Sequence, residues 1–333
     1  MKSIDRIIVL CCKRDFWLTR ICVASIRYWY PEIPIGIIKD VSLGDFDTRE
    51  MEGYWDVSVA AVPDPPRGYF TKLEAFYFPG RERILLLDSD IIFLGRVLEK
   101  LERHDEDFVV NWGGTKPLSA EKKKQYALDG YYNPEKLRNV LPDFELPDFF
   151  FNAGQMVLTS SLLVRGEVET WLMGTPPLQT ARFPEALTHL DQSLLNLLLV
   201  QMQRRGECTL GLCDFVRWSI HREMVWDIEL DRIRNRQGYP ALIHWAGVKT
   251  FHKSGFIRGD LLGFYEDLYY GRISSGELKR NIRLIRRARG GSISRSARIM
   301  ALLHKKIDFR KLLENERRPT REANPFAFVV SEK

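Results

Sequence analysis

The 333-residue sequence has no long apolar run and no paired cysteines. None of its apolar stretches approaches the roughly 18 residues that a membrane-spanning helix requires. Residues 7–12 are apolar but too short for the core of a secretory signal, and no small-residue cleavage site follows them. The five cysteines are scattered without a C-x-x-C pair, which argues against disulfides and against a zinc site. We therefore expect a cytoplasmic protein with reduced cysteines.

The sequence also lacks basic charge spread over the whole fold. Residues 272–333 contain 17 Lys and Arg against 6 Asp and Glu, a balance of +11 within a total net charge of +6. Residues 1–271 therefore carry 33 basic against 38 acidic side chains, a balance of −5. An acidic body without a nucleic-acid-binding motif excludes nucleic acid as an expected partner.

Short apolar segments alternate with helical patterns in the first third of the chain. The predicted strands are residues 7–10, 35–38, 57–62, 84–87 and 108–111, and the predicted helices are residues 16–29, 71–78 and 96–103. This alternation predicts an α/β protein with a mainly parallel, three-layer sheet. A hydrophobic content of 45% suffices for a large core in one or two domains.

The pattern becomes irregular between residues 113 and 147, where we expect a lid or a binding segment. The later predicted elements are a strand over 149–159 interrupted at 152–154, helices over 161–173 and 189–204, and a strand over 241–245. We expect one functional domain over residues 1–270 and a basic, helical extension over residues 271–333.

Two carboxylates follow the apolar strand at residues 84–87. Asp88 and Asp90 flank the small Ser89, and alternate residues of an extended chain point to the same side. Open α/β sheets bind ligands at the carboxyl ends of their buried strands. The two acids could therefore hold one hard cation facing a phosphorylated substrate. Acids in this position also serve as solvated turn residues or helix caps.

Two further segments place polar groups at the ends of predicted elements. Lys72 lies in the first turn of a helix that we expect Thr71 to cap, where the helix dipole disfavours a cation. A surface lysine is the simpler reading of that position. Asn152 and Gly154 interrupt an apolar strand, either because a ligand approaches the backbone there or because the strand forms a β-bulge.

Another two segments lie later in the chain. Asp191 and Gln192 open a helix, as site residues or as ordinary first-turn groups that complement the helix dipole. His244 leaves a late strand ahead of Gly247 and Lys249. A lone histidine at such a place is more often a satisfied core residue than a ligand.

The order and spacing of these segments resemble glycosyltransferase family 8, the group of glycogenin, galactinol synthase and bacterial lipopolysaccharide glucosyl- and galactosyltransferases. The resemblance runs from about residue 5 to 255 and is carried by Thr71-Lys72-Leu73, Asp88-Ser89-Asp90, Phe151-Asn152-Ala153-Gly154, Asp191-Gln192 with Leu194-Leu195-Asn196, and His244-x-x-Gly247 with Lys249. It implies a GT-A fold, a nucleotide-sugar donor that is usually UDP-linked, a Mn²⁺ or Mg²⁺ ion, and transfer with retention.

The resemblance also implies a role for each matching residue. Asp88, Asp90 and His244 match the metal ligands, and the imidazole nitrogen favours manganese over magnesium. Asp88 also matches a residue near the ribose, with Ser89 and Gly247 in the nucleotide-binding set. The cations near the sugar and diphosphate match Lys72 and Lys249, and the residues around the donor sugar and reaction centre match Asn152, Asp191 and Gln192. A double displacement would need a carboxylate beneath the anomeric carbon, where Asp191 or Gln192 is nearest in pattern. In the alternative, the acceptor enters on the leaving-group face with the diphosphate as its base.

Two features depart from the family pattern. Lys249 follows Gly247 by one residue fewer than is usual, and the Pro-Trp that commonly follows is missing, so Lys253 is the alternative contact to the diphosphate. The first strand ends in cysteines instead of the usual small and polar residues. We expect backbone groups near Cys11 and the side chain of Asp15 to meet the uracil.

Residues 278–306 combine Arg and Lys with Ile and Leu in the pattern of an amphipathic basic helix. Such a helix either lies on an anionic membrane surface or packs on the protein body. Membrane contact would suit a lipid-linked or cell-envelope acceptor and a position on the inner face of a membrane.

Three functions remain open from the sequence. The first is a metal-dependent, retaining hexosyltransferase that uses a UDP-sugar and a saccharide or glycolipid acceptor. The second is an inverting GT-A transferase, which would need a carboxylate as general base for the acceptor hydroxyl. The third is a non-catalytic nucleotide-sugar-binding protein.

Overall fold

The structure, a computed structural model, describes residues 2–60, 62, 68–113, 118–174, 179–248 and 253–288. The chain forms two compact units, Met1–Ala246 and Gly247–Lys333. Within the described residues, no helix is both long and apolar enough to cross a membrane.

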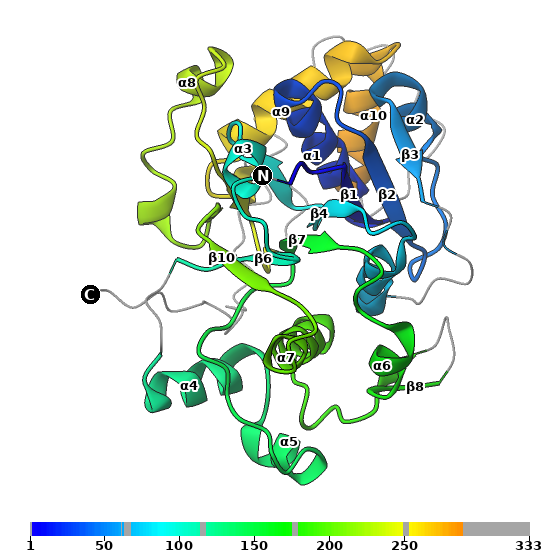
Figure 1. The fold of residues 1–333 in the computed structure, drawn as a ribbon. Helices are drawn as coiled ribbons and strands as arrows, with labels where there is room; N and C mark the ends of the chain where they lie inside the picture. Colours follow the sequence, from blue (N-terminus) through cyan, green and yellow to red (C-terminus); the bar gives the residue numbers. More distant parts are fainter. Residues whose placement is uncertain are drawn as a thin grey trace. The chain divides into compact units, whose positions relative to one another are not determined.

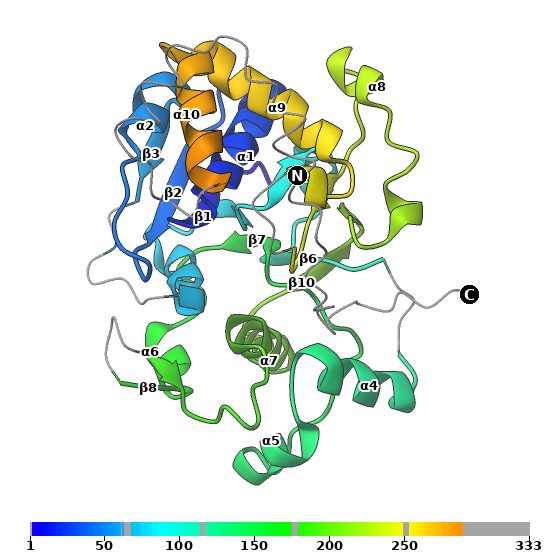
Figure 2. The same ribbon diagram turned by 180° about the vertical axis from the view of Figure 1, so that it is seen from behind.

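A seven-stranded sheet forms the centre of the first unit (Figures 1 and 2). In sheet order its strands are β10 (Leu210–Cys213), β6 (Phe108–Asn111), β7 (Gln155–Thr159), β4 (Arg83–Leu87), β1 (Arg6–Cys12), β2 (Ile35–Asp40) and β3 (Val57–Val59). The strand β7 pairs antiparallel with β4 and β6, and the other pairings in this sheet are parallel. The predicted α/β class with a mainly parallel sheet is confirmed.

The central strands are apolar along their whole length because helices cover both faces of the sheet. All five residues of β4 and of β7 are buried. Figures 1 and 2 show α1 (Phe16–Trp29) and α7 (Leu190–Arg204) on opposite sides of the sheet, as a three-layer arrangement requires. The bounds of α1 are those predicted from its apolar periodicity and the proline that follows it.

A smaller sheet lies beyond the end of β4. Its strands, in order, are β11 (Val216–Trp218), β12 (Leu242–His244) and β5 (Ile91–Phe93), with β12 parallel to β11 and antiparallel to β5. Because β5 begins directly after Asp90 and pairs with β12, the register places His244 opposite Ile91. A late segment of the chain is thereby brought back to the end of β4.

The remaining elements are shorter. Those of the first unit are α2 (Arg49–Trp55), η1 (Gly68–Tyr77), α3 (Leu98–Leu101), α4 (Ala120–Gly130), α5 (Pro134–Val140), α6 (Arg165–Glu169), β8 (Leu172–Met173), β9 (Thr180–Ala181), η2 (Arg222–Met224) and α8 (Leu230–Arg234). Those of the second unit are η3 (Lys253–Gly255), α9 (Gly259–Arg272) and α10 (Gly276–Ala288).

The structure differs from the sequence-based expectation in several segments. The strand predicted over 149–159 begins only at Gln155, and the helix predicted over 161–173 is limited to Arg165–Glu169 and is followed by β8. The helix that carries Lys72 is a 3₁₀ helix that already begins at Gly68, so Thr71 does not cap it. The backbone N–H of Gly68 donates to Asp40 Oδ1 at 3.0 Å, which anchors this earlier start at the end of β2.

The segment 113–147 contains α4 and α5, although the sequence pattern there had indicated irregular structure. The side chain of Ser119 caps α4, and Asn133 caps α5 ahead of Pro134 in its first turn. These capping residues define the two helices where apolar periodicity is weak.

Candidate active site

Asp88 and Asp90 lie at the carboxyl end of β4, where the sequence predicted them. Their backbones are fixed on both sides: Asp88 N donates to Gly154 O at 2.7 Å, and Trp245 N donates to Asp90 O at 3.2 Å. Ser89 between them is buried. The two acids are thereby held between the start of β7 and the end of β12, which are far apart in the sequence.

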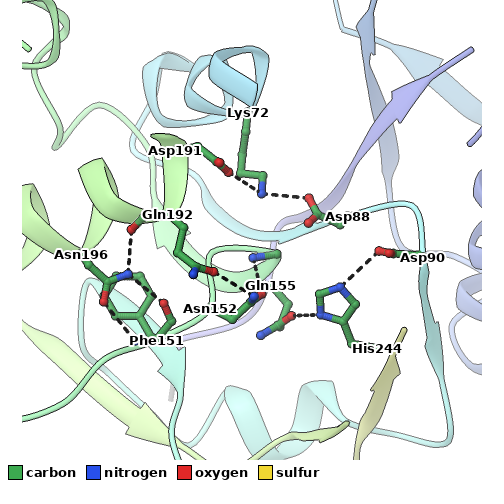
Figure 3. Close-up of polar contacts among 11 residues, drawn as sticks. Lys72, Asp88, Asp90, Phe151, Asn152, Gln155, Asp191, Gln192, Asn196 and His244 are labelled. Carbon is green, nitrogen blue, oxygen red and sulfur yellow. Dashed lines mark hydrogen bonds and ion pairs between the residues drawn. The ribbon is translucent and has the colours of Figure 1, made fainter. Parts of the chain in front are cut away.

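His244 joins the two acids from the end of β12. Its Nε2 lies 3.2 Å from Asp90 Oδ1, and its Nδ1 lies 2.8 Å from Gln155 Oε1 on the first residue of β7 (Figure 3). The imidazole is 3% exposed and stands against the ring of Trp218, with ring centroids 5.3 Å apart. Both ring nitrogens are thus engaged, and the ring orientation is fixed.

Asp88, Asp90 and His244 could together hold a metal ion. Each offers one ligand atom, and these atoms all lie within 4.8 Å of one another. Bonds of roughly 2.0–2.2 Å place ligand atoms on opposite sides of an ion about 4–4.4 Å apart, so this spacing needs little adjustment. Two carboxylates and an imidazole suit Mn²⁺ or Mg²⁺, with nitrogen favouring Mn²⁺.

Gly154 is necessary for this close arrangement. A Cβ at this position would lie 2.6 Å from His244 Cε1 and 2.7 Å from both Asp88 Oδ2 and Asn152 Oδ1. Any side chain at residue 154 would therefore displace two of the three candidate metal ligands. This is the close approach for which a glycine within a strand pattern is a signal.

Lys72 lies on the other side of Asp88 and bridges two carboxylates. Its Nζ is 3.0 Å from Asp88 Oδ1 and 2.9 Å from Asp191 Oδ2 (Figure 3). The side chains of Lys72 and Asp191 are only 6% and 10% exposed. Burial disfavours the charged lysine, but the two carboxylates outweigh burial and raise the pKa of Lys72 above its ordinary value. Burial raises the pKa of Asp88, and the attraction of Lys72 only partly offsets this effect.

Asn152 and Gln192 are joined by their side-chain amides. Asn152 Nδ2 donates to Gln192 Oε1 at 2.9 Å, and Gln192 Nε2 donates to Gly130 O at the end of α4 at 3.0 Å. Asn152 Oδ1 accepts from Gly154 N at 2.8 Å. The amide of Gln192 is therefore committed at both ends, and it links the segment 113–147 to the loop beside the two acids.

Asn196 supports this loop from one turn further along α7. Its Oδ1 accepts from Phe151 N at 3.0 Å, while its Nδ2 donates to Phe151 O and to Gln192 O, both at 2.8 Å. The side chain is fully buried. Asn196 belongs to the sequence pattern, but its function as a clamp on the backbone before Asn152 could be read only from the structure.

The residues expected at the uracil lie at the carboxyl end of β1, which pairs with β4. Cys11 is buried and accepts a hydrogen bond from Thr19 Oγ1 at 3.1 Å, and burial raises the pKa of its thiol to about 12. Asp15 precedes α1 and contacts Arg14 and Cys12. The sulfur of Cys11 therefore belongs to the core, and the contact with uracil stays a prediction.

The residues expected at the diphosphate lie mostly in the second unit. Gly247 has a φ of +74°, a conformation that favours glycine. Lys249 lies outside the described residues. Its alternative, Lys253, forms an ion pair with Glu266 Oε2 at 2.5 Å inside the second unit. In the described part of the chain, Lys72 is therefore the cation seen in contact with the candidate metal ligands.

Gln155 was missed by the sequence analysis, as was the contact between Trp218 and His244. The available signal for Gln155 was a polar residue at the start of an otherwise apolar strand, directly after Gly154. Trp218 gave no sequence signal, because its position depends on the pairing of β11 with β12.

The sequence matches no family model, and a search of curated proteins finds no match. Among solved structures, the chain is similar to the galactosyltransferase LgtC in complex with donor and acceptor sugar analogues. The identity is 14%, the match covers 81% of this chain and 96% of that one, and the TM-score is 0.49.

Two further similar structures are larger glycosyltransferases. The bifunctional glycosyltransferase WbbM matches at 12% identity over 81% of this chain, with a TM-score of 0.47. The glycosyltransferase GlyE of Streptococcus pneumoniae matches at 11% identity over 79% of this chain, with a TM-score of 0.43. The chain spans 50% of the length of WbbM and 60% of the length of GlyE.

We predict that replacing Lys72 with methionine destabilises the protein by about 3–5 kcal/mol, because it leaves Asp88 and Asp191 without their shared cation. Urea unfolding measures the change. The matched control is Lys123→Met, which breaks a 2.5 Å pair with the half-exposed Asp148 and should cost about 0–1 kcal/mol. Equal losses in the two variants would show that Lys72 is no more than a surface charge.

Proposed function

We propose that this protein is a metal-dependent, retaining glycosyltransferase that moves a hexose from a UDP-sugar to a saccharide or lipid-linked cell-envelope acceptor. The observation that carries the proposal is one partly buried polar cluster at the carboxyl end of β4. It combines the ligand set Asp88, Asp90 and His244 with the Lys72–Asp191 ion pair. The GT-A assignment belongs to the same proposal.

The cluster matches the charges that develop in glycosyl transfer. The bond between the anomeric carbon and a diphosphate oxygen breaks, so negative charge grows on the leaving group and positive charge grows on the sugar ring. A divalent cation held by Asp88, Asp90 and His244 would supply stabilisation of the first charge. Asp191 and the amide oxygens of the neighbouring loop suit the second.

Each residue of the chain has a distinct task in this proposal. Lys72 keeps Asp88 and Asp191 close together at one edge of the donor site. Asn152, fixed by Gln192 and by Gly154 N, lines the sugar. Asp191 is the carboxylate nearest to the expected position of the anomeric carbon. Ser89, the backbone near Cys11 and Asp15 complete the proposed nucleotide site, and the resemblance of the sequence also assigns Gly247 and Lys249 to the donor.

We predict that Asp90→Asn lowers Mn²⁺-dependent turnover of the UDP-sugar by about 100-fold or more, since a metal ion in such a site contributes several kcal/mol. The donor is first identified by thermal shift with a panel of nucleotide sugars and Mn²⁺, because a bound ligand stabilises the folded protein. Release of UDP then measures turnover.

The matched control for this experiment is Asp231→Asn on α8. Its side chain is 82% exposed and pairs only with Arg234 in the same helix among the described contacts. Its turnover should equal that of the wild type. Metal-dependent turnover that survives in Asp90→Asn would contradict the metal assignment, and donor binding without any turnover would favour a non-catalytic binding protein.

We further predict that the transferred sugar keeps its anomeric configuration, which proton NMR of the freshly formed product determines from the anomeric coupling. An inverting enzyme needs a carboxylate that accepts the proton of the acceptor hydroxyl. Asp191, the candidate acid at the reaction centre, is engaged by Lys72 at 2.9 Å. An inverted product would replace the retaining mechanism with the inverting alternative and leave the metal site intact.

We also propose a cytoplasmic enzyme whose basic segment, residues 278–306, meets an anionic membrane surface. The helix α10 covers the first part of this segment, and residues 289–306 lie outside the described residues. The full chain should sediment with anionic liposomes at low salt and be released at high salt, because surface charges are screened. Zwitterionic liposomes are the control, and failure to sediment with anionic ones would remove the membrane contact from the proposal.

A further inference from the structure

We propose that Gln155 is a positioning residue for the metal site. Its amide oxygen holds His244 in the tautomer whose Nδ1 carries the proton, so that Nε2 offers its lone pair toward the metal position. The inference rests on the proposed function, because it assigns to His244 the part of a metal ligand. Gln155 acts in this inference only through its contact with His244.

The geometry around the imidazole carries this inference. Gln155 Oε1 lies 2.8 Å from Nδ1, while Nε2 on the opposite side of the ring lies 3.2 Å from Asp90 Oδ1 (Figure 3). A carbonyl-type oxygen only accepts hydrogen bonds, so it selects the ring form that carries a proton on Nδ1. A neutral ring of that form has its lone pair on Nε2, which is the nitrogen on the Asp90 side.

The burial of Gln155 argues that its side chain does more than fill space in the core. It is 0% exposed on a strand whose other residues are Met, Val, Leu and Thr, and its Nε2 has no hydrogen-bond partner among the described residues. A buried donor without a partner destabilises a fold, and an aliphatic side chain would avoid this cost. The contact with His244 is the compensating interaction that the structure offers.

The pairing of β7 with β4 also holds the acceptor oxygen of Gln155 in a fixed position. Its backbone pairs with Leu87, the last residue of β4, in the antiparallel register of β7. The acceptor for His244 is therefore built on the same strand pair that presents Asp88. A neutral amide fixes the ring without adding a third negative charge next to the two acids.

The test measures Mn²⁺ affinity of the nucleotide-free protein by isothermal titration calorimetry. Gln155→Met removes the acceptor at nearly constant volume and should weaken Mn²⁺ binding by about 10- to 100-fold, the usual effect of losing such a supporting partner. Gln155→Glu retains an acceptor oxygen and should keep affinity within about threefold of wild type or raise it. Met156→Leu, in the same buried strand, is the packing control and should bind like the wild type.

The tautomer is read directly by ¹⁵N NMR of histidine-labelled protein with Mg²⁺, a diamagnetic ion of the same ligand preference, in place of Mn²⁺. The His244 signal is assigned by its absence in His244→Asn. Wild type and Gln155→Glu should show the proton on Nδ1, and Gln155→Met should shift the population toward Nε2. A loss of packing alone would not move this signal.

The outcomes separate the inference from the proposed function. Unchanged affinity and an unchanged tautomer in Gln155→Met, with binding abolished in Asp90→Asn, would overturn the role of Gln155 and leave the metal site standing. Absence of Mn²⁺ binding in the wild type, with or without UDP, would overturn the metal-dependent function itself. Weak binding by Gln155→Met that Gln155→Glu rescues supports both.

Discussion

The antiparallel course of β7 is the constraint on which the candidate site depends. Because β7 runs against its neighbours, its first residue, Gln155, lies beside Leu87 at the end of β4. The loop before β7 consequently meets the acids that follow β4, and Gly154 supplies both a backbone contact to Asp88 and the space that His244 requires. A parallel strand at this place would carry the same loop to the opposite edge of the sheet, away from both acids.

This constraint brings several charged side chains into a small volume. Whether the folded protein is stable with them depends on how they pair. Asp88 is shared between two partners: one of its oxygens contacts Lys72, and the residue also belongs to the cluster with Asp90 and His244. Lys72 in turn is shared with Asp191. Buried charges are stable only when each has a counter-charge, so a cation on the Asp90 side would complete a balance that Lys72 supplies on the other. A metal ion bound there would therefore be coupled to the placement of Asp191 through Asp88.

The sequence allowed the prediction of the α/β class, of α1, of the end of β4 and of the three residues that the structure brings together as a candidate metal cluster. These predictions succeeded because each rests on a local pattern, such as an apolar run ending in acids, or on a resemblance carried by several motifs. What could not be predicted depends on strand pairing. Gln155 and Trp218 contact His244 only because β7 pairs with β4 and β11 pairs with β12. The early start of η1 likewise depends on a long-range bond between Asp40 and Gly68.

The hydrogen-bond network distinguishes between the two residues that sequence pattern placed at the reaction centre. The amide of Gln192 accepts from Asn152 and donates to Gly130 O, so its use in bond formation would break the link between α4 and the loop at Asn152. Among the described residues, the contact of the Asp191 side chain is its ion pair with Lys72, which engages one of its two oxygens. A carboxylate that is oriented by a lysine and retains a second oxygen can stabilise positive charge on a sugar without disturbing the fold. These contacts are the reason why we propose Asp191, and not Gln192, as the group that faces the anomeric carbon. Gln192 connects α4 to the loop at Asn152.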